Sequence, residues 1–137
     1  MTVTLDLNVL LDVFQQREPH YAASAQIVGG VMKGKLLGIV PAHALTTLYY
    51  LSRKHGSKPE AEKAIDRVLS GFQIGNLDQP GWEKARRLPI SDFEDAAVAM
   101  VAVATVSAFI VTRNVNDFDG SPVPAISPDD FISREKI

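Results

Sequence analysis

The sequence predicts an α/β protein in which helices cover a central parallel sheet. Short apolar, β-branched runs alternate with longer segments whose apolar residues recur at helical spacing, which is typical of βαβ units. The run Phe109-Ile110-Val111-Thr112 is almost wholly apolar, as expected of a strand buried on both faces of a parallel sheet. The chain has 137 residues, 46% of them hydrophobic, and shows no long linker or internal repeat, so we expect one domain over residues 1–137.

The first half of the chain is expected to hold two strands and four helices. Glu18-Pro19 opens the second helix, with the proline in its first turn, and His55-Gly56 ends the third. The core face of the fourth helix is expected to consist of Ala61, Ala64, Ile65, Val68 and Leu69. The strands are expected over residues 3–5 and 36–40, and the helices over 8–14, 18–34, 42–53 and from 58 onward.

The second half is expected to continue the alternation. Ser91 and Glu94 fit a capping box before a helix that is apolar nearly all round and should therefore be buried against the sheet. Ser127-Pro128 has the form of a helix start, with serine as the cap. We expect strands over residues 72–76, 109–112 and 123–126, the last at an edge of the sheet, and helices over 82–88, 92–106 and from 128 onward.

Composition excludes several classes of protein. The chain has no cysteine, which rules out a disulfide scaffold, a cysteine-type zinc site, an iron–sulfur cluster and a cysteine nucleophile, and which suits a reducing cytoplasm. No apolar run approaches the roughly 20 residues of a membrane span, and residues 1–12 lack the basic region of a signal peptide. We therefore expect a cytoplasmic protein without a membrane partner. The three histidines do not have metal-binding spacing.

Charge is distributed unevenly along the chain. Residues 43–87 hold eight basic and five acidic side chains, whereas residues 88–137 hold three basic and eight acidic ones. This asymmetry could place a surface that attracts a polyanion beside an acidic site. Ordinary solvated helix faces would give the same pattern.

Acidic residues stand at the ends of three elements that we expect to be buried. Asp6 ends the first strand, Asp95 lies in the first turn of the apolar helix, and Asp117 follows the strand over 109–112. Sites in open α/β sheets form at the carboxyl ends of strands, where the strand order reverses. Carboxylates gathered there would repel one another unless a cation neutralised them, and Mg²⁺ or Mn²⁺ prefers such oxygen ligands. A bound ion of this kind can activate water and brace a phosphodiester.

Neighbouring polar residues also have structural explanations. Asp92 and Glu94 would stabilise a helix N-terminus through its dipole. Asp12 could be a solvated helix residue or could orient the site. Asn8 and Asn114 could be cap or turn residues, and Asp117 could also be a turn residue.

Three segments together resemble the PIN domain family. The opening Leu5-Asp6-Leu7-Asn8-Val9-Leu10-Leu11-Asp12 is similar to the D-x-N-V-L-L-D start of these domains. Asp92-Phe93-Glu94-Asp95-Ala96 is similar to the D-F-E-D-A of one branch, and the segment over 111–118 to its T-R-N-x-x-D-F. The three segments come in the family's order and span nearly the whole chain.

This resemblance implies a three-layer α/β/α sandwich and a Mg²⁺- or Mn²⁺-dependent ribonuclease, commonly the VapC-type toxin of a toxin–antitoxin pair. It implies that Asp6, Asp95 and Asp117 carry the catalytic metal site. Thr112 and Asn114 would hold its edge, and Asn8 would orient the first aspartate. A cognate antitoxin and a homodimer are the implied protein partners.

The chain departs from many VapC-type members at two places. Its helix after the second strand, over residues 44–50, holds no acid where many members have a glutamate, and Asn114 stands where many have an aspartate. The site could therefore hold one metal rather than two, or use Asp92 or Glu94.

Three functions follow from these observations. The first is a metal-dependent endoribonuclease specific for single-stranded RNA, whose substrate is guided by Arg53, Lys54, Arg86 and Arg87. The second is a catalytically weak or inactive module that binds RNA or protein. The third is aspartyl-phosphate chemistry, which usually has D-x-D-x-T, whereas Asn8 and Leu10 occupy the second and third of those positions here.

Overall fold

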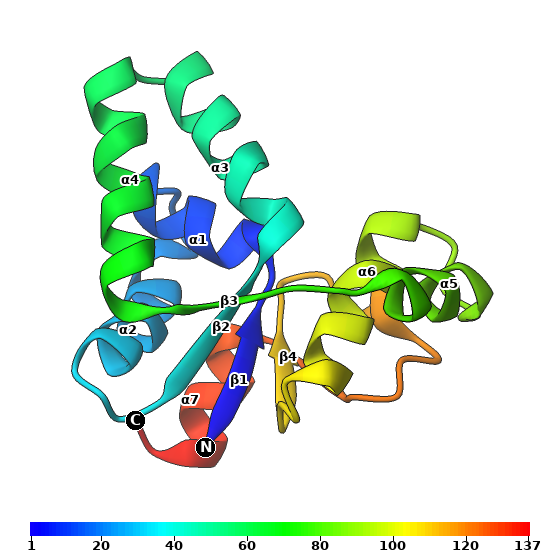
Figure 1. The fold of residues 1–137 in the computed structure, drawn as a ribbon. Helices are drawn as coiled ribbons and strands as arrows, with labels where there is room; N and C mark the ends of the chain where they lie inside the picture. Colours follow the sequence, from blue (N-terminus) through cyan, green and yellow to red (C-terminus); the bar gives the residue numbers. More distant parts are fainter.

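A computed structural model describes all 137 residues and contains a five-stranded parallel sheet in the order β3-β2-β1-β4-β5. The chain builds β1, β2 and β3 in one direction and then returns to the other side of β1 to form β4 (Figure 1). The strand order therefore reverses between β1 and β4. The strands are β1 (Thr2–Leu5), β2 (Leu37–Pro41), β3 (Gln73–Gly75), β4 (Phe109–Val111) and β5 (Ala125–Ile126).

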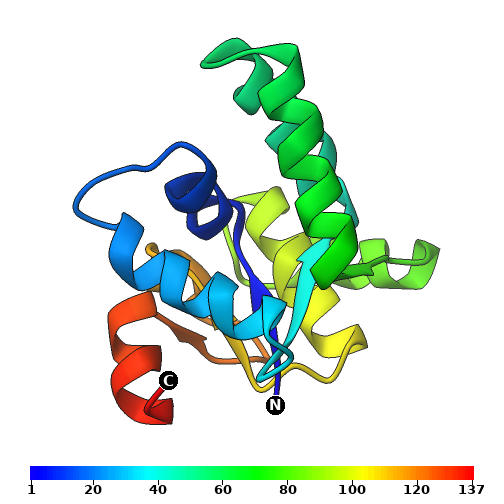
Figure 2. The same ribbon diagram turned by 90° about the vertical axis from the view of Figure 1, so that its left-hand side faces the viewer.

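Helices cover both faces of this sheet, as predicted. The turned view shows α2 and α7 on the side of the sheet opposite α6 (Figure 2). Successive residues of β4 enter different cores, because Val111 packs with α1, α2 and α7 while Ile110 packs with α5 and α6. The helices are α1 (Leu7–Phe14), α2 (Tyr21–Met32), α3 (Ala42–Lys54), α4 (Lys58–Gly71), α5 (Gln79–Arg87), α6 (Phe93–Ala104) and α7 (Pro128–Glu135), with a short 3-10 turn, η1 (Val115–Phe118).

The α3–α4 hairpin and the α5–α6 pair form the two arms of an L (Figure 1). The carboxyl ends of β1 and β4 lie at its inner corner. Alanines in α6 allow it to pack closely on the sheet, and Gly75 of β3 is needed for this contact, since a Cβ atom there would lie 2.5 Å from Cγ1 of Val101. This packing brings the first turn of α6 to the same corner. None of the helices combines the length and the apolar character that crossing a bilayer requires.

Several sequence predictions at helix ends and on one helix face were wrong in detail. The second helix begins at Tyr21, after Pro19, which lies in the preceding turn. The cap of α6 is Asp92 rather than Ser91, because the Asp92 side chain accepts from the backbone N–H of Asp95. Leu69 is 54% exposed, since α4 packs mainly through its smaller residues.

The cap of α5 lies earlier than predicted, at Asp78, so the helix starts before Trp82. The predicted start of α7 is confirmed, because the Ser127 hydroxyl accepts from Asp130.

Candidate functional site

The register of the sheet brings Asp6 and Thr112 together. Leu5 of β1 pairs with Val111 of β4, so the residues that follow them lie side by side. Thr112 Oγ1 donates a hydrogen bond of 2.8 Å to Asp6 Oδ2. The other carboxylate oxygen, Oδ1, accepts from the N–H of Leu7 at 2.8 Å and so caps α1. Asp6 is therefore both a helix cap and the fixed acid of the corner.

Asn8 connects the same two chain segments. Its Nδ2 lies 3.4 Å from Asp6 Oδ2 and 3.4 Å from Thr112 Oγ1. Its Oδ1 accepts from the backbone N–H of Arg113 at 3.3 Å. Thr112 Oγ1 also accepts from the N–H of Asn114 at 3.0 Å. Asn114 is thus held through its backbone, and its exposed side chain makes no hydrogen bond.

Asp12 is fully buried and pairs with Arg113, a partner that sequence reasoning missed. Arg113 Nε donates to Asp12 Oδ2 at 2.7 Å, and the Ser24 hydroxyl donates to the same oxygen at 3.2 Å. The other oxygen, Oδ1, has no hydrogen-bond partner. Because Asp12 is buried, it is not a solvated helix residue, which was one of the two roles considered for it. Its contact with Arg113 fixes the start of the loop that leads to Asp117.

Two of the acids predicted for the site, Asp6 and Asp117, lie near enough to Asp95 for their charges to act on it. Burial first, and then the charges of Asp6, Asp92, Asp117 and Glu94, raise the pKa of Asp95 to about 7. Burial also raises the pKa of Asp6, although the hydrogen bond from Thr112 opposes this. The charges of Asp6 and Asp117 therefore both act on Asp95. Asp92 caps the N-terminus of α6, so it has the structural role at a helix start that the sequence offered for it.

The donor set matches a hard divalent cation in chemistry, although no ligand cage is preformed. The side chains of Asp6, Asp95 and Asp117 are all carboxylates, and burial together with neighbouring negative charge raises the pKa of Asp95. No three His, Asp or Glu side chains are spaced to hold an ion as they stand. Asp117 is exposed and Asp95 is half-buried, so neither carboxylate is enclosed by the core.

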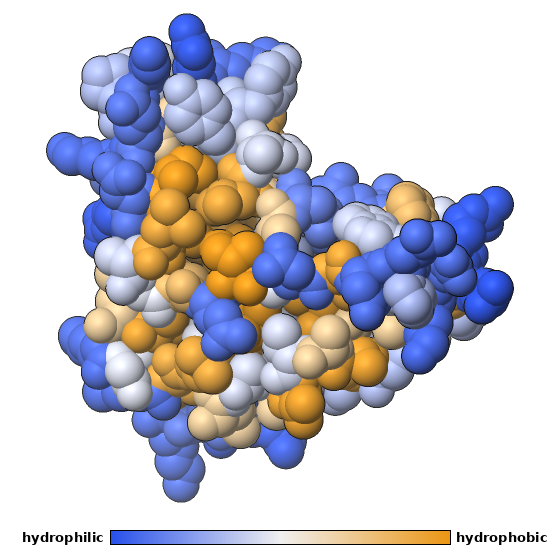
Figure 3. Space-filling model, in the orientation of Figure 1, coloured by the Kyte–Doolittle hydropathy of each residue, from blue (hydrophilic) through white to orange (hydrophobic).

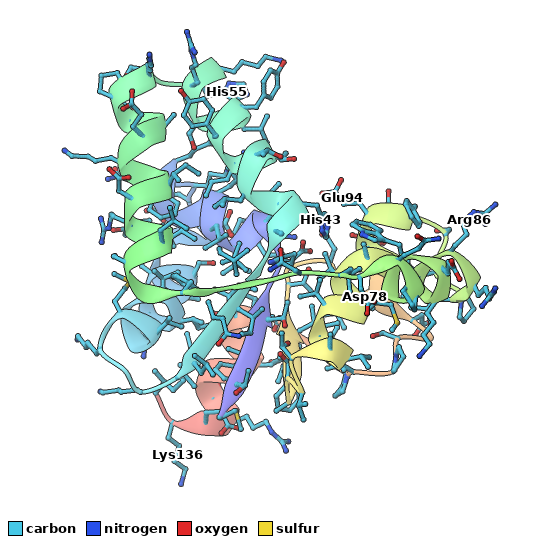
Figure 4. All side chains as sticks on the ribbon, in the orientation of Figure 1. His43, His55, Asp78, Arg86, Glu94 and Lys136 are labelled. Carbon is cyan, nitrogen blue, oxygen red and sulfur yellow. The ribbon has the colours of Figure 1, made fainter.

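An aromatic row beside the acids was not predicted. His43 of α3 and Trp82 of α5 meet edge to face with ring centroids 5.8 Å apart, and Trp82 packs on Phe93 of α6 at 5.8 Å. Burial lowers the pKa of His43, against the opposing influences of Glu94 and Asp6, and its buried Nε2 has no partner. Figure 4 shows His43 beside Glu94 at the inner corner. The only feature of the sequence that could have indicated a place for His43 near the acids was its position just after a predicted strand.

The predicted basic residues lie away from the acids. Arg53 and Lys54 are in the last turn of α3, whereas His43 is in its first, so about 15 Å of helix separates them. Arg86 and Arg87 are in the last turn of α5, and Arg86 points away from the corner (Figure 4). The helix α3 contributes no acid, as the sequence indicated.

Two hollows flank different parts of the molecule. The larger, of about 950 Å³, lies among α1, α2, the end of α3 and α4 and includes none of the clustered acids. The smaller, of about 340 Å³, is lined by residues Arg113, Asn114, Val115, Asn116 and Asp117. The site is therefore an open, polar corner rather than an enclosed pocket.

The fold and the acidic corner at the strand-order reversal define an α/β protein of the PIN class. The PIN domain family model matches residues 2–116, and the chain belongs to this family. No curated protein matches the sequence.

Solved toxin–antitoxin structures share the fold. The VapBC2 structure from Rickettsia felis, bound to a promoter DNA fragment, has a TM-score of 0.68 at 18% identity, covering 93% of this chain and 98% of that one. DNA-bound VapBC from Salmonella typhimurium has a TM-score of 0.70 at 14% identity, covering 93% of this chain and 98% of that one. VapC20 of Mycobacterium tuberculosis, a toxin that cleaves the sarcin–ricin loop, has a TM-score of 0.64 at 11% identity, covering 79% of this chain and 86% of that one.

Proposed function

We propose that this protein is a Mg²⁺- or Mn²⁺-dependent endoribonuclease and the toxin of a VapBC-type pair. The observation that carries the proposal is the environment of Asp95, where burial, together with the charges of neighbouring acids that include Asp6 and Asp117, raises the pKa of its carboxyl group to about 7. The structural neighbours support it, because they are toxin–antitoxin proteins with the same fold. Asp6, Asp95 and Asp117 would hold the ion, which when bound supplies an activated water and charge stabilisation at the phosphodiester.

The chain's own residues prepare this chemistry. Thr112 and Leu7 hold the Asp6 carboxylate in one orientation, so that its remaining lone pairs face the corner. Asn8 links Asp6 to the loop that carries Asn114 and Asp117. Glu94 lies close enough to add negative charge, and it would take the place of the acid that α3 lacks.

Substitution of Asp6 tests this proposal. Asp6→Asn keeps the shape of the side chain and its capping oxygen but removes the charge, so RNA cleavage with Mg²⁺ or Mn²⁺ is expected to fall by about 100-fold or more. Asp129→Asn, an exposed change in the first turn of α7, is the matched control and should cleave like the wild type. A chelator should abolish cleavage by the wild type and by Asp129→Asn. Full activity of Asp6→Asn would remove Asp6 from the mechanism.

We propose three partners for this site and fold: an RNA substrate, a cognate antitoxin and a second copy of the chain. A basic side chain from the antitoxin tail would neutralise the acidic corner in place of the cation. Arg53, Lys54, Arg86 and Arg87 would attract the RNA backbone over a distance rather than contact the acids. Apolar side chains gather over the lower part of the α3–α4 hairpin and along β3 (Figure 3), which supports self-association through the middle helices.

The second candidate function is a binding module without turnover. The absence of an acid in α3 and of a preformed ligand cage favours it. Salt-sensitive RNA binding with no cleavage under any divalent ion would select this function over the ribonuclease.

A further inference from the structure

Phe93 is the exposed aromatic ring nearest the acidic corner. It is the first residue of α6 and lies two positions before Asp95, yet 49% of it is exposed. Of the other phenylalanines, Phe72, Phe118 and Phe131 are buried, and Phe14 and Phe109 are partly buried. A large apolar ring in water at the edge of a charged site suggests a ligand with an apolar face.

The inner side of Phe93 is fixed in place by Trp82. The two rings lie 5.8 Å apart at an interplanar angle of 42°, and Trp82 in turn meets His43 edge to face at 5.8 Å. These contacts do not explain the exposure of Phe93, because α5 and α6 already pack through the buried side chains of Ala85 and Val98, with Ile90 of the connecting loop buried beside them. Phe93 is therefore a supported ring with its outer half free.

We infer that Phe93, supported by Trp82, stacks with an unpaired nucleobase of the RNA that the neighbouring carboxylates hold through their cation. This inference deepens the proposed function and depends on it for the identity of the ligand. A base within a duplex has both faces occupied by its neighbours, whereas an unpaired base can leave the strand and stack on an aromatic side chain. Phe93 carries no hydrogen-bonding group and would therefore accept any of the bases.

The charges around the ring agree with this assignment. The acids of the corner repel phosphate unless a cation is bound, so a neutral base is the part of a nucleotide best suited to lie beside them. Positive charge lies further along α5, whose last turn carries Lys84, Arg86 and Arg87. Arg86 follows Trp82 by about one turn of helix and points away from the corner (Figure 4). These cations would attract the RNA backbone from a distance.

The single tryptophan of the chain provides a direct measurement. Trp82 touches Phe93, so a base stacked there should quench its fluorescence. The probes are oligoadenylate and an abasic ribose-phosphate oligomer of the same length and charge. Both are titrated in Mg²⁺ with every protein carrying Asp6→Asn, whether otherwise wild type or changed at Phe93 or Tyr50, so that cleavage is suppressed and a cation remains at the other carboxylates. Oligoadenylate is expected to quench Trp82 and to bind about tenfold more tightly than the abasic oligomer.

Phe93→Leu removes the π face and keeps an apolar side chain. It is expected to weaken oligoadenylate binding, measured by competition or calorimetry, by about tenfold and to leave the abasic oligomer unchanged. Phe93→Trp should restore tight binding. Tyr50→Leu is the matched control, because Tyr50 is a 60% exposed aromatic residue on α3 outside the row. Its affinity for both oligomers should equal that of the wild type.

The outcomes separate this inference from the ribonuclease proposal. Equal affinity of the wild type for the two oligomers, or an equal loss in Phe93→Leu and Tyr50→Leu, would overturn stacking at Phe93. Cleavage could still be intact in that case, and the ribonuclease proposal would stand. Base-dependent binding without cleavage under any divalent ion would instead support stacking and contradict the ribonuclease.

Discussion

The Thr112 hydroxyl donates a 2.8 Å hydrogen bond to the carboxylate of Asp6 across 106 positions of sequence. This bond joins the ends of β1 and β4, the two strands between which the strand order reverses. Thr112 is fully buried, so water cannot replace its hydroxyl if it is removed. The orientation of Asp6 therefore depends on a residue that would not itself be expected to touch an ion.

Thr112→Val should reduce metal-dependent RNA cleavage by about 10- to 100-fold, because it leaves Asp6 Oδ2 without its donor. It also leaves the N–H of Asn114 without an acceptor. Thr112→Ser keeps the hydroxyl and should retain most of the activity. The measurement is the metal concentration dependence of cleavage for the three proteins. Equal curves for the valine and serine variants would contradict a role for the hydroxyl.

Arg113→Leu should lower the free energy of unfolding by about 3 kcal/mol, because it leaves the Asp12 carboxylate buried without its cation. Urea denaturation measures this change. Arg53→Leu removes an exposed arginine instead and should stay within about 0.5 kcal/mol of the wild type. If the two variants are equally stable, the Arg113–Asp12 pair does not support the loop.

The pKa of Asp95 predicts a dependence of stability on pH. Its ordinary value of 3.8 is raised in the folded protein to about 7, so ionisation favours the unfolded state. The metal-free protein should therefore lose stability as pH rises from about 4 to about 7 and should not regain it above that range. Thermal unfolding in a chelator at pH values across this window measures the effect.

Asp95→Asn should flatten that dependence and melt at a higher temperature than the wild type above pH 7. Because the pKa of Asp6 is also raised, the stability of Asp95→Asn should still fall with rising pH, but less steeply than that of the wild type. Added Mg²⁺ should stabilise the wild type more above pH 7 than below it, because only the ionised carboxylates bind the ion. An unchanged slope in Asp95→Asn would show that another group is responsible.

Leu69→Glu tests self-association through the middle helices. Leu69 of α4 is 54% exposed, and a charge there should weaken a contact between two copies without disturbing the fold. Light scattering after gel filtration should report a dimer for the wild type and a larger monomer fraction for the variant. A wild type that is monomeric at all concentrations would refute the homodimer proposal.

The parts of the fold that could be predicted were those set by local chemistry. Strand and helix order followed from the alternation of apolar runs, and the start of α7 followed from Ser127-Pro128. The expectation that Asp6, Asp95 and Asp117 share one site rests on a general property of parallel sheets, whose strand ends share one edge, and it stays a prediction.

The missed features depend on packing between distant segments. The cation paired with Asp12 could not be identified, because Arg113 lies 101 positions away and many arginines were available. The row of His43, Trp82 and Phe93 joins three helices, and no spacing in the sequence encodes how those helices sit together. The exposure of Leu69 depends similarly on how closely α4 approaches its neighbours.

The central pairing of β1 with β4 also determines when the acidic corner can form during synthesis of the protein. A nascent chain contains Asp6 from the start, but its partner at Thr112 is absent until most of the polypeptide has left the ribosome. Until then the first aspartate has neither its hydroxyl donor nor the loop bearing Asp117. The acidic corner is thus completed late during translation, and under the proposed function an unfinished chain would have no assembled centre with which to cleave RNA near the ribosome that is making it.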